Sequence, residues 1–265
     1  MTGHLGYGKF RKTRRFQKLI ERRPLGSRLS TCLQSRLKHL TESHHVSSGS
    51  DQIVLAFTGA SGAAYGVRLL EVLLGQGATV HLVVSPAAHR VFEAELGLHL
   101  EQGPITLAKL QSAEIDWWQG RQPVPTMGAG QLHVHGYHDY SAGIASGSFR
   151  TAGMVICPCS MGTLASVAQG LSTNLIQRAA DVHLKERRKL IVVPRETPLG
   201  LIQIDNMRRL TEAGGVVLPA MPGLYHRPQS IIDLIDFVVA RICDQLGRPV
   251  AFAKRWSESS SGPLS

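Results

Sequence analysis

The sequence has few cysteines, few aromatic residues and no long apolar segment. Aromatic side chains make up 6% of the 265 residues. No stretch approaches the roughly 18–20 apolar residues that cross a bilayer, which argues against an integral membrane protein. The four cysteines, Cys32, Cys157, Cys159 and Cys243, show neither CxxC pairing nor zinc spacing, so we expect reduced thiols in a reducing compartment. Cys157 and Cys159 end an apolar run, where we expect packing rather than catalysis.

Acidic residues are scarce at the N-terminus, and this scarcity explains the net charge of +10. Residues 1–50 contain 11 Lys or Arg but only two acids, Glu21 and Glu42, which leaves 18 basic and 17 acidic residues for the rest of the chain. The nearly neutral body gives no sign of a nucleic-acid partner. The N-terminal segment also lacks the apolar core of roughly 7–15 residues that a secretory signal has. We predict that residues 1–50 are a basic, disordered extension of a cytoplasmic protein; a mitochondrial presequence is the alternative.

The rest of the chain alternates short apolar runs with helical patterns. Hydrophobicity within the runs is continuous, which is typical of parallel strands covered by helices on both faces. We therefore predict an α/β fold with a doubly wound parallel sheet in three layers, an added strand in QLHVHGYHDY and a last helix from about Gln229 to Leu246. The predicted strands cover residues 53–57, 79–85, 154–159, 189–194 and 214–220.

Small and polar residues follow these strands, where doubly wound sheets bind ligands. After the first strand, residues 58–62 read TGASG. Its glycines, with the free N–H groups at the start of the next helix, predict a phosphate cradle. The glycine spacing is GxxGxxxG rather than GxGxxG, and the chain has no Tyr-x-x-x-Lys pair for carbonyl chemistry, so a nicotinamide-dependent reductase is not indicated. A tight turn in an ordinary α/β domain is the alternative.

Hydroxyl groups and backbone donors at three strand ends suit a phosphate or a flavin-like ring. Any one of the serines also suits a helix N-cap, which is the simpler interpretation of each alone. Together at one edge of a sheet they favour a ligand. The residues are Ser61, Ser85, Ser160, Met161, Gly162 and Thr163.

Residues that suit an anion occur in two further segments. Arg178 and Lys185 are seven residues apart, which places them on one helical face. Tyr225 and Arg241 offer a hydroxyl and a guanidinium. Solvated surface positions are the alternative for all four.

A cation and a carboxylate, Arg195 and Glu196, directly follow a buried strand. This position is the edge where ligands bind. A carboxylate among cations is ionised and able to take a proton, so Glu196 is a candidate for proton transfer.

The histidines His133, His135 and His138 form an H-x-H-x-x-H pattern. On a strand, only His133 and His135 share a face, and Asp139 is the one carboxylate or thiolate suitably placed beside them. We expect no metal site here.

Seven motifs carry a resemblance to a known family. They are TGASGAAYG, ASGS, PCSMGTL, RAADVHLKERR, VPRETPL, PGLYHRPQS and RW, in this order from about Asp51 to Trp256. In these motifs the sequence resembles the flavin prenyltransferases of the UbiX type. The resemblance implies a catalytic domain over residues 51–256 and a disordered tail over 257–265.

The same resemblance implies a fold and an activity. Members have a flavodoxin-like, Rossmann-like α/β fold, bind FMN and usually form dodecamers. They join a dimethylallyl group from its monophosphate to N5 and C6 of reduced FMN, and UbiD-type decarboxylases, often in ubiquinone synthesis, receive the prenylated flavin.

Carried over to this sequence, the resemblance assigns site residues by their motifs. Glu196 matches the family's acid and Ser61 lies near flavin N5, with Lys185 as a third catalytic residue. The FMN contacts are Gly59, Ala60, Ser61, Ser85, Ser160, Met161, Gly162, Thr163 and Arg195. The prenyl phosphate is assigned to Arg178, Lys185, Tyr225 and Arg241.

The chemistry of the assigned residues agrees with this activity. Fixed cations clamp a leaving phosphate without a metal. The chain has no Asp-Asp pair, whereas prenyl diphosphate enzymes present Asp-rich clusters to Mg²⁺, so a monophosphate donor is expected. Aromatic faces suit an allyl cation, and Trp256 matches a family tryptophan. Tyr140 stands where a related protein has Trp, and residues 200–207 also depart from the family pattern, so the prenyl pocket is expected to differ in shape.

Three rival functions remain. A cysteine-peptide decarboxylase of the same superfamily carries a PxMNxxMW motif that is absent here. Direct decarboxylation of an aromatic acid has no evident site in the sequence. A flavin carrier without catalytic activity would need the FMN contacts but neither Glu196 nor Lys185.

Overall fold

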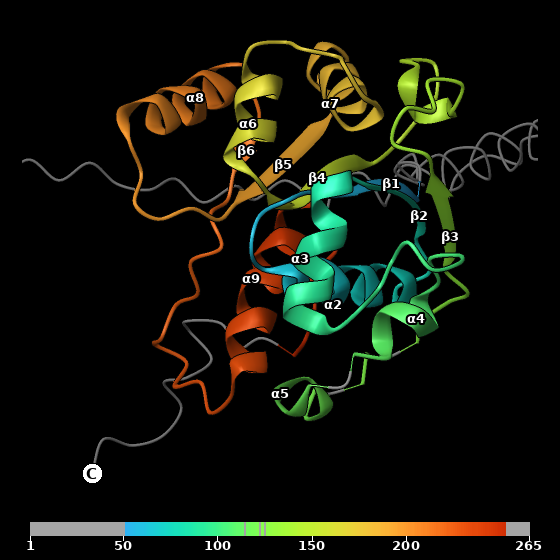
Figure 1. The fold of residues 1–265 in the computed structure, drawn as a ribbon, viewed down its shortest axis with the longest axis vertical. Helices are drawn as coiled ribbons and strands as arrows, with labels where there is room; N and C mark the ends of the chain where they lie inside the picture. Colours follow the sequence, from blue (N-terminus) through green and yellow to red (C-terminus); the bar gives the residue numbers. More distant parts are fainter. Residues whose placement is uncertain (1–50, 114, 122, 125, 253–265) are drawn as a thin grey trace, which may run out of the picture. The chain divides into compact units, whose positions relative to one another are not determined.

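A six-stranded parallel sheet forms the centre of the computed structural model, which describes residues 51–113, 115–121, 123–124 and 126–252 (Figure 1). The strand order is β3-β2-β1-β4-β5-β6. The strands are β1 (Gln52–Phe57), β2 (Thr79–Val84), β3 (Gln131–His135), β4 (Gly153–Cys159), β5 (Lys189–Pro194) and β6 (Val216–Val217). The predicted α/β class and the added strand at residues 131–135 are confirmed.

The strand order reverses at β1. This strand pairs with β2 on one side, where Gln52 lies opposite Thr79, and with β4 on the other, where Ile53 lies opposite Gly153. The chain proceeds outward from β1 to β3, and then returns to begin the other half of the sheet at β4. Such a reversal leaves a crevice outside the carboxyl ends of the two central strands, β1 and β4.

The last strand is shorter than predicted. Residues 214–220 were expected to form it, but β6 contains only two residues. The N–H groups of Leu218 and Ala220 still donate to Val192 and Pro194 of β5, at 2.8 and 3.1 Å. Pro219 lies between them and has no N–H group, so regular pairing ends here.

Helices cover both faces of the sheet (Figure 1). One face packs against α2 (Ala63–Gly75), α3 (Pro86–Leu96) and α9 (Ile231–Gln245), with the short α4 (Leu107–Gln111) and α5 (Asp116–Gln119) beside them. The other face packs against η2 (Gly143–Ala145), α6 (Met161–Ala168), α7 (Leu175–Lys185) and α8 (Leu201–Glu212). Successive residues of β1 enter opposite clusters, since Leu55 packs toward α2 and Ala56 toward α6 and α7. This alternation explains why the strands are apolar without interruption.

A buried ion pair joins α2 to α9. The Arg68 guanidinium is 1% exposed and donates to Asp236 through Nε at 2.7 Å and Nη2 at 3.2 Å. Its Nη1 donates to Glu71 at 3.1 Å. Because charges this deep need partners, the network fixes how the two helices pack together.

Some sequence predictions fall outside the described residues. They concern the extension 1–50, the tail 257–265, Cys32 and Trp256. Within the described ranges, no helix is both long enough and apolar enough to cross a membrane.

Candidate active site

The candidate FMN contacts lie together at the carboxyl edge of the sheet. Parallel strands place their following loops at the same edge. The residues that the structure brings to this edge are Gly59, Ala60, Ser61, Ser85, Ser160, Met161, Gly162, Thr163, Arg195 and Glu196. The loops after β1 and β4 are neighbours, because these two strands are paired.

Thr58 joins those two loops. Its hydroxyl donates to the carbonyl of Pro158 at 2.9 Å and accepts the backbone N–H of Ser160 at 2.8 Å. Its own carbonyl accepts the N–H of Ala60 at 2.9 Å, which closes the turn after β1. The side chain is 1% exposed.

The loop after β1 packs tightly against α3. A Cβ at Gly59 would lie 2.5 Å from the Cβ of Ala87, so only glycine fits this close approach. A Cβ at Gly162, in contrast, would meet no atom within 4 Å. The start of α6 therefore faces open space, and its first N–H groups have no partner within the helix.

Two of the three serines at the strand ends, Ser85 and Ser160, cap helices, as their simpler interpretation predicts, whereas the N-cap of α2 is Gly62 rather than Ser61. Ser160 caps α6, where its Oγ accepts the N–H of Thr163 at 3.3 Å and donates to the Thr163 hydroxyl at 3.0 Å. Ser85 caps α3 by accepting the N–H of Ala88 at 3.2 Å, and it is 6% exposed. Capping does not prevent either hydroxyl from also contacting a ligand, since a hydroxyl oxygen has two acceptor sites.

The start of α2 does not offer the free N–H groups that the sequence predicted. The Glu95 carboxylate of α3 accepts the N–H of Gly62 at 2.9 and 3.1 Å and that of Ala63 at 2.8 Å. A protein carboxylate thus already satisfies this helix terminus. The prediction of unpaired N–H groups at this helix start is wrong for Gly62 and Ala63, because packing between helices supplies an anion that local sequence does not reveal.

A tyrosine lies in the same region as Glu95. Burial raises the pKa of the Tyr65 phenol, and the negative charge of Glu95 raises it further while Arg195 acts against the rise. The Tyr65 ring also packs over the turn, since a Cβ at Gly62 would lie 2.8 Å from its Cδ2. Glu95 and Tyr65 are therefore candidate site residues that the sequence interpretation missed. The sequence could have pointed to Glu95 through its position beside the buried apolar residues of α3.

The end of β5 presents Arg195 and Glu196 to solvent. Glu196 accepts the N–H of Thr197 through Oε1 at 3.0 Å. This bond fixes one carboxylate oxygen and leaves the other available to take a proton.

Arg178 and Lys185, the two candidate cations of α7, lie beside a different segment, residues 145–149. Arg178 donates through Nε to the carbonyl of Ala145 at 2.9 Å and pairs with Asp181 at 2.8 Å. Lys185 pairs with Glu186 at 2.6 Å, and its Nζ would lie 3.0 Å from a Cβ at Gly147. Helix α7 ends at Lys185, four residues before β5 begins, so Lys185 lies toward the amino-terminal edge of the sheet. A six-residue strand separates the two edges by about 20 Å.

Tyr225 and Arg241 lie on the opposite face of the sheet from α7. Tyr225 packs edge-on against Phe237 of α9, with ring centroids 5.6 Å apart. Arg241 is in the last turns of α9 and pairs with Asp244 at 3.0 Å. One chain therefore does not bring its four candidate phosphate ligands together.

The cysteines and histidines have structural surroundings. Burial raises the pKa of the thiols of Cys157, Cys159 and Cys243, so these thiols stay protonated. His81 stacks between His133 and His135 with ring centroids 5.2 Å apart in each case. Among the described residues, no group of three or more His, Cys, Asp or Glu side chains is arranged to hold a metal ion.

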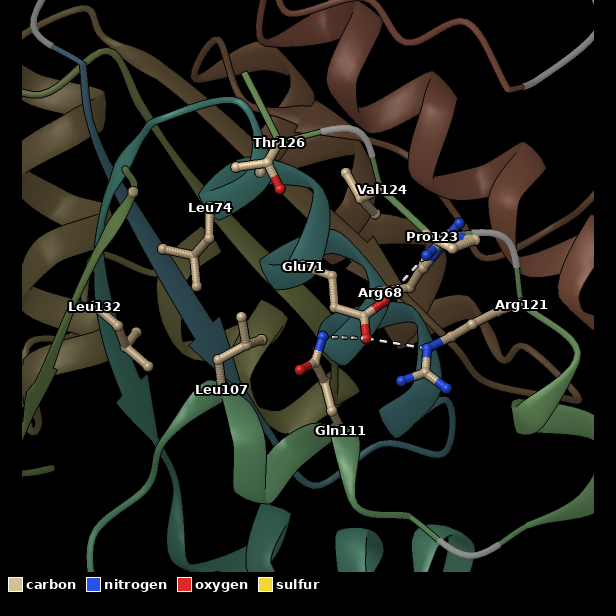
Figure 2. Close-up of a pocket in the computed structure, with 12 residues that line it drawn as sticks. Arg68, Glu71, Leu74, Leu107, Gln111, Arg121, Pro123, Val124, Thr126 and Leu132 are labelled. Carbon is tan, nitrogen blue, oxygen red and sulfur yellow. Dashed lines mark hydrogen bonds and ion pairs between the residues drawn. The ribbon is translucent and has the colours of Figure 1, made fainter. Parts of the chain in front are cut away.

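A cavity of about 640 Å³ lies away from the carboxyl edge (Figure 2). It is lined by the later turns of α2, by α4, by residues 121–126 and by the start of β3. Gln111 and Arg121 converge on Glu71, each donating to its Oε1 at 3.1 Å (Figure 2). The carboxylate is thereby fully partnered, and none of the candidate site residues lines this cavity.

Comparison with known sequences gives consistent matches. The Flavoprotein family model matches residues 41–243. The chain is 49% identical over 206 residues to Flavin prenyltransferase UbiX of Alkalihalophilus pseudofirmus, which covers 78% of this chain and 96% of that protein. It is 48% identical over 211 residues to Flavin prenyltransferase UbiX of Pseudomonas aeruginosa, which covers 80% of this chain and 96% of that protein.

Solved structures match the same part of the chain. A dodecameric FMN-dependent UbiX-like decarboxylase from Escherichia coli O157:H7 is 38% identical with a TM-score of 0.63, and the match covers 77% of this chain and 98% of that one. AnUbiX (PadA1), in complex with FMN and dimethylallyl pyrophosphate, is 37% identical with a TM-score of 0.64, and the match covers 77% and 96%.

Proposed function

The chain belongs to the Flavoprotein family and, within it, to the UbiX-type flavin prenyltransferases, and we therefore propose that it transfers a dimethylallyl group to reduced FMN. The observation that carries the proposal is the gathering of the candidate FMN contacts at one sheet edge. When bound, reduced FMN supplies the nucleophilic N5 and C6 atoms that accept the prenyl carbons. The product is prenylated FMN, and a UbiD-type decarboxylase is its proposed recipient.

The residues at the carboxyl edge suit FMN. Open space in front of Gly162 and the first N–H groups of α6, of which that of Thr163 already donates to Ser160, suit its phosphate. Arg195 extends from the neighbouring strand β5 and adds a positive charge. The loop at Gly59, held close to α3, leaves backbone available to the ring system. The start of α2 is not part of the phosphate site, because Glu95 already occupies it.

We assign the prenyl phosphate to cations from more than one copy of the chain. Helix α7, which carries Arg178 and Lys185, packs on one face of the sheet and α9, which carries Arg241, packs on the other, and Lys185 lies toward the amino-terminal edge of the sheet. A site that joins these groups to FMN needs a neighbouring copy. The dodecameric relative from Escherichia coli supports such an assembly.

Exposed apolar side chains support the same assembly. Leu201 and Ile202 at the start of α8 are each 74% exposed, and Leu224, in the loop before α9, is 69% exposed. These residues follow β5 and β6, whose carboxyl ends belong to the site edge. Apolar surface of this kind is typical of an interface between subunits.

In the proposed reaction, fixed cations bind the phosphate and withdraw it from the donor. Lys185 and Arg178 then stabilise the departing phosphate, and exclusion of water by the neighbouring copy protects the allyl cation. Glu196 would assist the proton transfer of ring closure, in which C2 of the prenyl double bond gains a proton and flavin C6 loses one, through the oxygen that Thr197 does not bind. Ser61 lies at the flavin side of the loop that Glu95 and Thr58 hold.

The proposed donor is dimethylallyl monophosphate. AnUbiX (PadA1) was solved with the pyrophosphate, so both esters belong in the test. The absence of an Asp-Asp pair favours the monophosphate, because the second phosphate of a pyrophosphate leaving group is normally held through Mg²⁺ bound to such carboxylates.

An anaerobic assay tests the activity. Purified protein is incubated with reduced FMN and either ester, without added metal, and the flavin is examined by mass spectrometry. We expect FMN heavier by one prenyl unit, formed faster from the monophosphate. Unmodified FMN with both esters would overturn the proposal.

Mixed assemblies test the division of the site between copies. Copies carrying Lys185→Ala are unfolded, mixed and refolded with copies carrying Glu196→Gln, each variant alone being inactive. If the two residues of one site come from different copies, about a quarter of the sites in random assemblies are intact. If both come from the same copy, the mixture stays inactive.

Direct decarboxylation is a second candidate, because the relative from Escherichia coli is described as a decarboxylase. It predicts release of CO₂ from an aromatic acid without any prenyl donor. A flavin carrier, in contrast, predicts that Glu196→Gln still passes FMN to a decarboxylase without loss of function. As to location, we propose the cytoplasm, which the free thiols Cys157, Cys159 and Cys243 support.

A further inference from the structure

We propose that Thr58 is a positioning residue that sets the loop after β1 and the loop after β4 at the spacing needed to hold FMN. The proposal rests on the proposed function, because that function assigns both loops to FMN. Thr58 itself is not among the assigned contacts. Its side chain is 1% exposed and points between the loops rather than to solvent.

Regular pairing between the two central strands stops just before the site. The register runs from Ile53 opposite Gly153 to Ala56 opposite Ile156. Two residues later the chain reaches Pro158, which has no N–H group to donate. The neighbouring pairing of β4 with β5 is also irregular between Ile156 and Cys159. Beyond this register the backbone joins the two loops through the Thr58 N–H, which donates to the Pro158 carbonyl at 3.2 Å, but the irregular pairing leaves the position of Ser160 to side-chain contacts.

The Thr58 hydroxyl supplies the missing connection. The hydroxyl donates to the carbonyl of Pro158 at 2.9 Å and accepts the N–H of Ser160 at 2.8 Å. The Thr58 N–H also donates to the Pro158 carbonyl at 3.2 Å. The Thr58 hydroxyl therefore acts as donor and as acceptor at once, and both bonds link the loop after β1 to the loop after β4.

The connection extends into both loops. The Thr58 carbonyl accepts the N–H of Ala60 at 2.9 Å and so defines the turn that carries Ser61. On the other side, Ser160 binds Thr163 through two hydrogen bonds, at 3.0 and 3.3 Å, and thereby starts α6. A change at Thr58 consequently reaches the proposed contacts on both sides of the ligand.

Threonine suits this task better than other residues. Its branched Cβ restricts χ1, which favours one rotamer for the hydroxyl, and the whole side chain is buried. Valine has nearly the same shape but leaves the Ser160 N–H and the Pro158 carbonyl without this partner. In this buried position the Ser160 N–H would lack an acceptor unless the loop moved, whereas the Pro158 carbonyl would keep the Thr58 N–H.

The test compares FMN binding by wild type, Thr58→Val, Thr58→Ser and Thr58→Ala. FMN affinity is measured by fluorescence titration of the apoprotein, and the absorbance spectrum of bound flavin is recorded. We expect Thr58→Val and Thr58→Ala to bind FMN about tenfold or more weakly, which corresponds to about 1.4 kcal/mol, with an altered spectrum. Thr58→Ser keeps the hydroxyl and is expected to remain within about threefold of wild type.

Thr151→Val is the matched control. The Thr151 hydroxyl also bonds another side chain, His183 Nε2 at 2.8 Å, but it precedes β4 at the opposite edge of the sheet. This variant is expected to lose thermal stability without a change in FMN affinity or spectrum. If Thr58→Val folds and binds FMN with wild-type affinity and spectrum, the inference is wrong. If Thr58→Val does not fold, Thr58→Ala decides instead, and wild-type FMN binding by that variant overturns the inference. Failure of wild type to bind FMN at all would instead refute the proposed function.

Discussion

Glu95 Oε2 lies 2.8 Å from the backbone nitrogen of Ala63, at the start of α2. The same carboxylate accepts the N–H of Gly62, the residue after Ser61. Gly62 has a φ of 110°, a conformation that glycine adopts readily. Glu95 therefore caps α2 from another helix and holds the Ser61 turn in a backbone conformation that few other residues tolerate.

Removing this carboxylate is expected to affect both stability and catalysis. Glu95→Ala leaves two backbone N–H groups without their acceptor, which costs about 1–3 kcal/mol. Because Ser61 loses its support, we also expect product formation to fall by about tenfold or more. Urea denaturation and the prenylation assay measure the two effects.

Glu93→Ala is the control on the same helix. The Glu93 side chain is 59% exposed and pairs with His99 at 3.5 Å. A change of this kind at the surface is expected to cost less than about 0.5 kcal/mol. Equal losses in the two variants would show that Glu95 has no special part in holding the turn.

The sheet and its site edge were predictable because their signals are local. Uninterrupted apolar runs identify buried parallel strands, and small or polar residues identify the ends of those strands. Residues 58–62 and 160–163 therefore fell at the correct edge. The cap of α2 was not predictable in this way. Phe92 stacks on Phe57 with ring centroids 5.0 Å apart, and this tertiary contact places Glu95, three residues later, at the start of another helix.

The cation pair of α7 shows a second limit of sequence patterns. The spacing of Arg178 and Lys185 correctly indicates one helical face, but it does not indicate what that face meets. In the chain it meets the loop at Ala145 and Gly147 rather than the candidate FMN contacts. The missing information is the arrangement of neighbouring copies, which no local spacing encodes.

Lys185→Ala is expected to separate donor binding from FMN binding. The variant removes a charge assigned to the prenyl phosphate but touches no assigned FMN contact. We expect the KM for dimethylallyl monophosphate to rise, or kcat to fall, by about tenfold or more while FMN affinity stays unchanged. Steady-state kinetics and fluorescence titration give the two values. Lys109→Ala, at a partly exposed lysine of α4, should change neither; parallel loss of FMN affinity in Lys185→Ala would count against the assignment.

Breaking the buried pair between α2 and α9 is expected to be costly. In Asp236→Asn the Arg68 guanidinium, 1% exposed, loses the carboxylate that binds its Nε and Nη2. Removing one partner of a buried ion pair typically destabilises a protein by about 3–5 kcal/mol, and Glu71, which still binds Nη1, should place the loss at the lower end of this range. Asp205→Asn is the control, because its pair with Arg208 is exposed and should contribute about 0–1 kcal/mol. Urea denaturation of both variants checks the difference, and similar losses would contradict it.

The three stacked histidines predict a loss of stability in mild acid. Burial, followed by the neighbouring His135 and His133, lowers the pKa of His81 from 6.5 to about 4. Between these two values the unfolded chain takes a proton that the folded chain refuses, so stability is complete above the ordinary pKa and falls as the pH drops toward 4. From pH 7 to pH 5 this amounts to about 2 kcal/mol for His81.

The variant His81→Gln tests the source of that loss. Unfolding is followed in urea at several pH values and at one protein concentration, because assembly also affects apparent stability. We expect the variant to be less stable than wild type at pH 7, because it loses the ring stack. Since Gln has no proton to gain in this range, its stability should decline less steeply on acidification than that of wild type. His99→Gln, at a half-exposed histidine paired with Glu93, should retain the wild-type slope. An unchanged slope in His81→Gln would mean that other groups, such as the buried His183, whose pKa burial also lowers, account for the acid sensitivity.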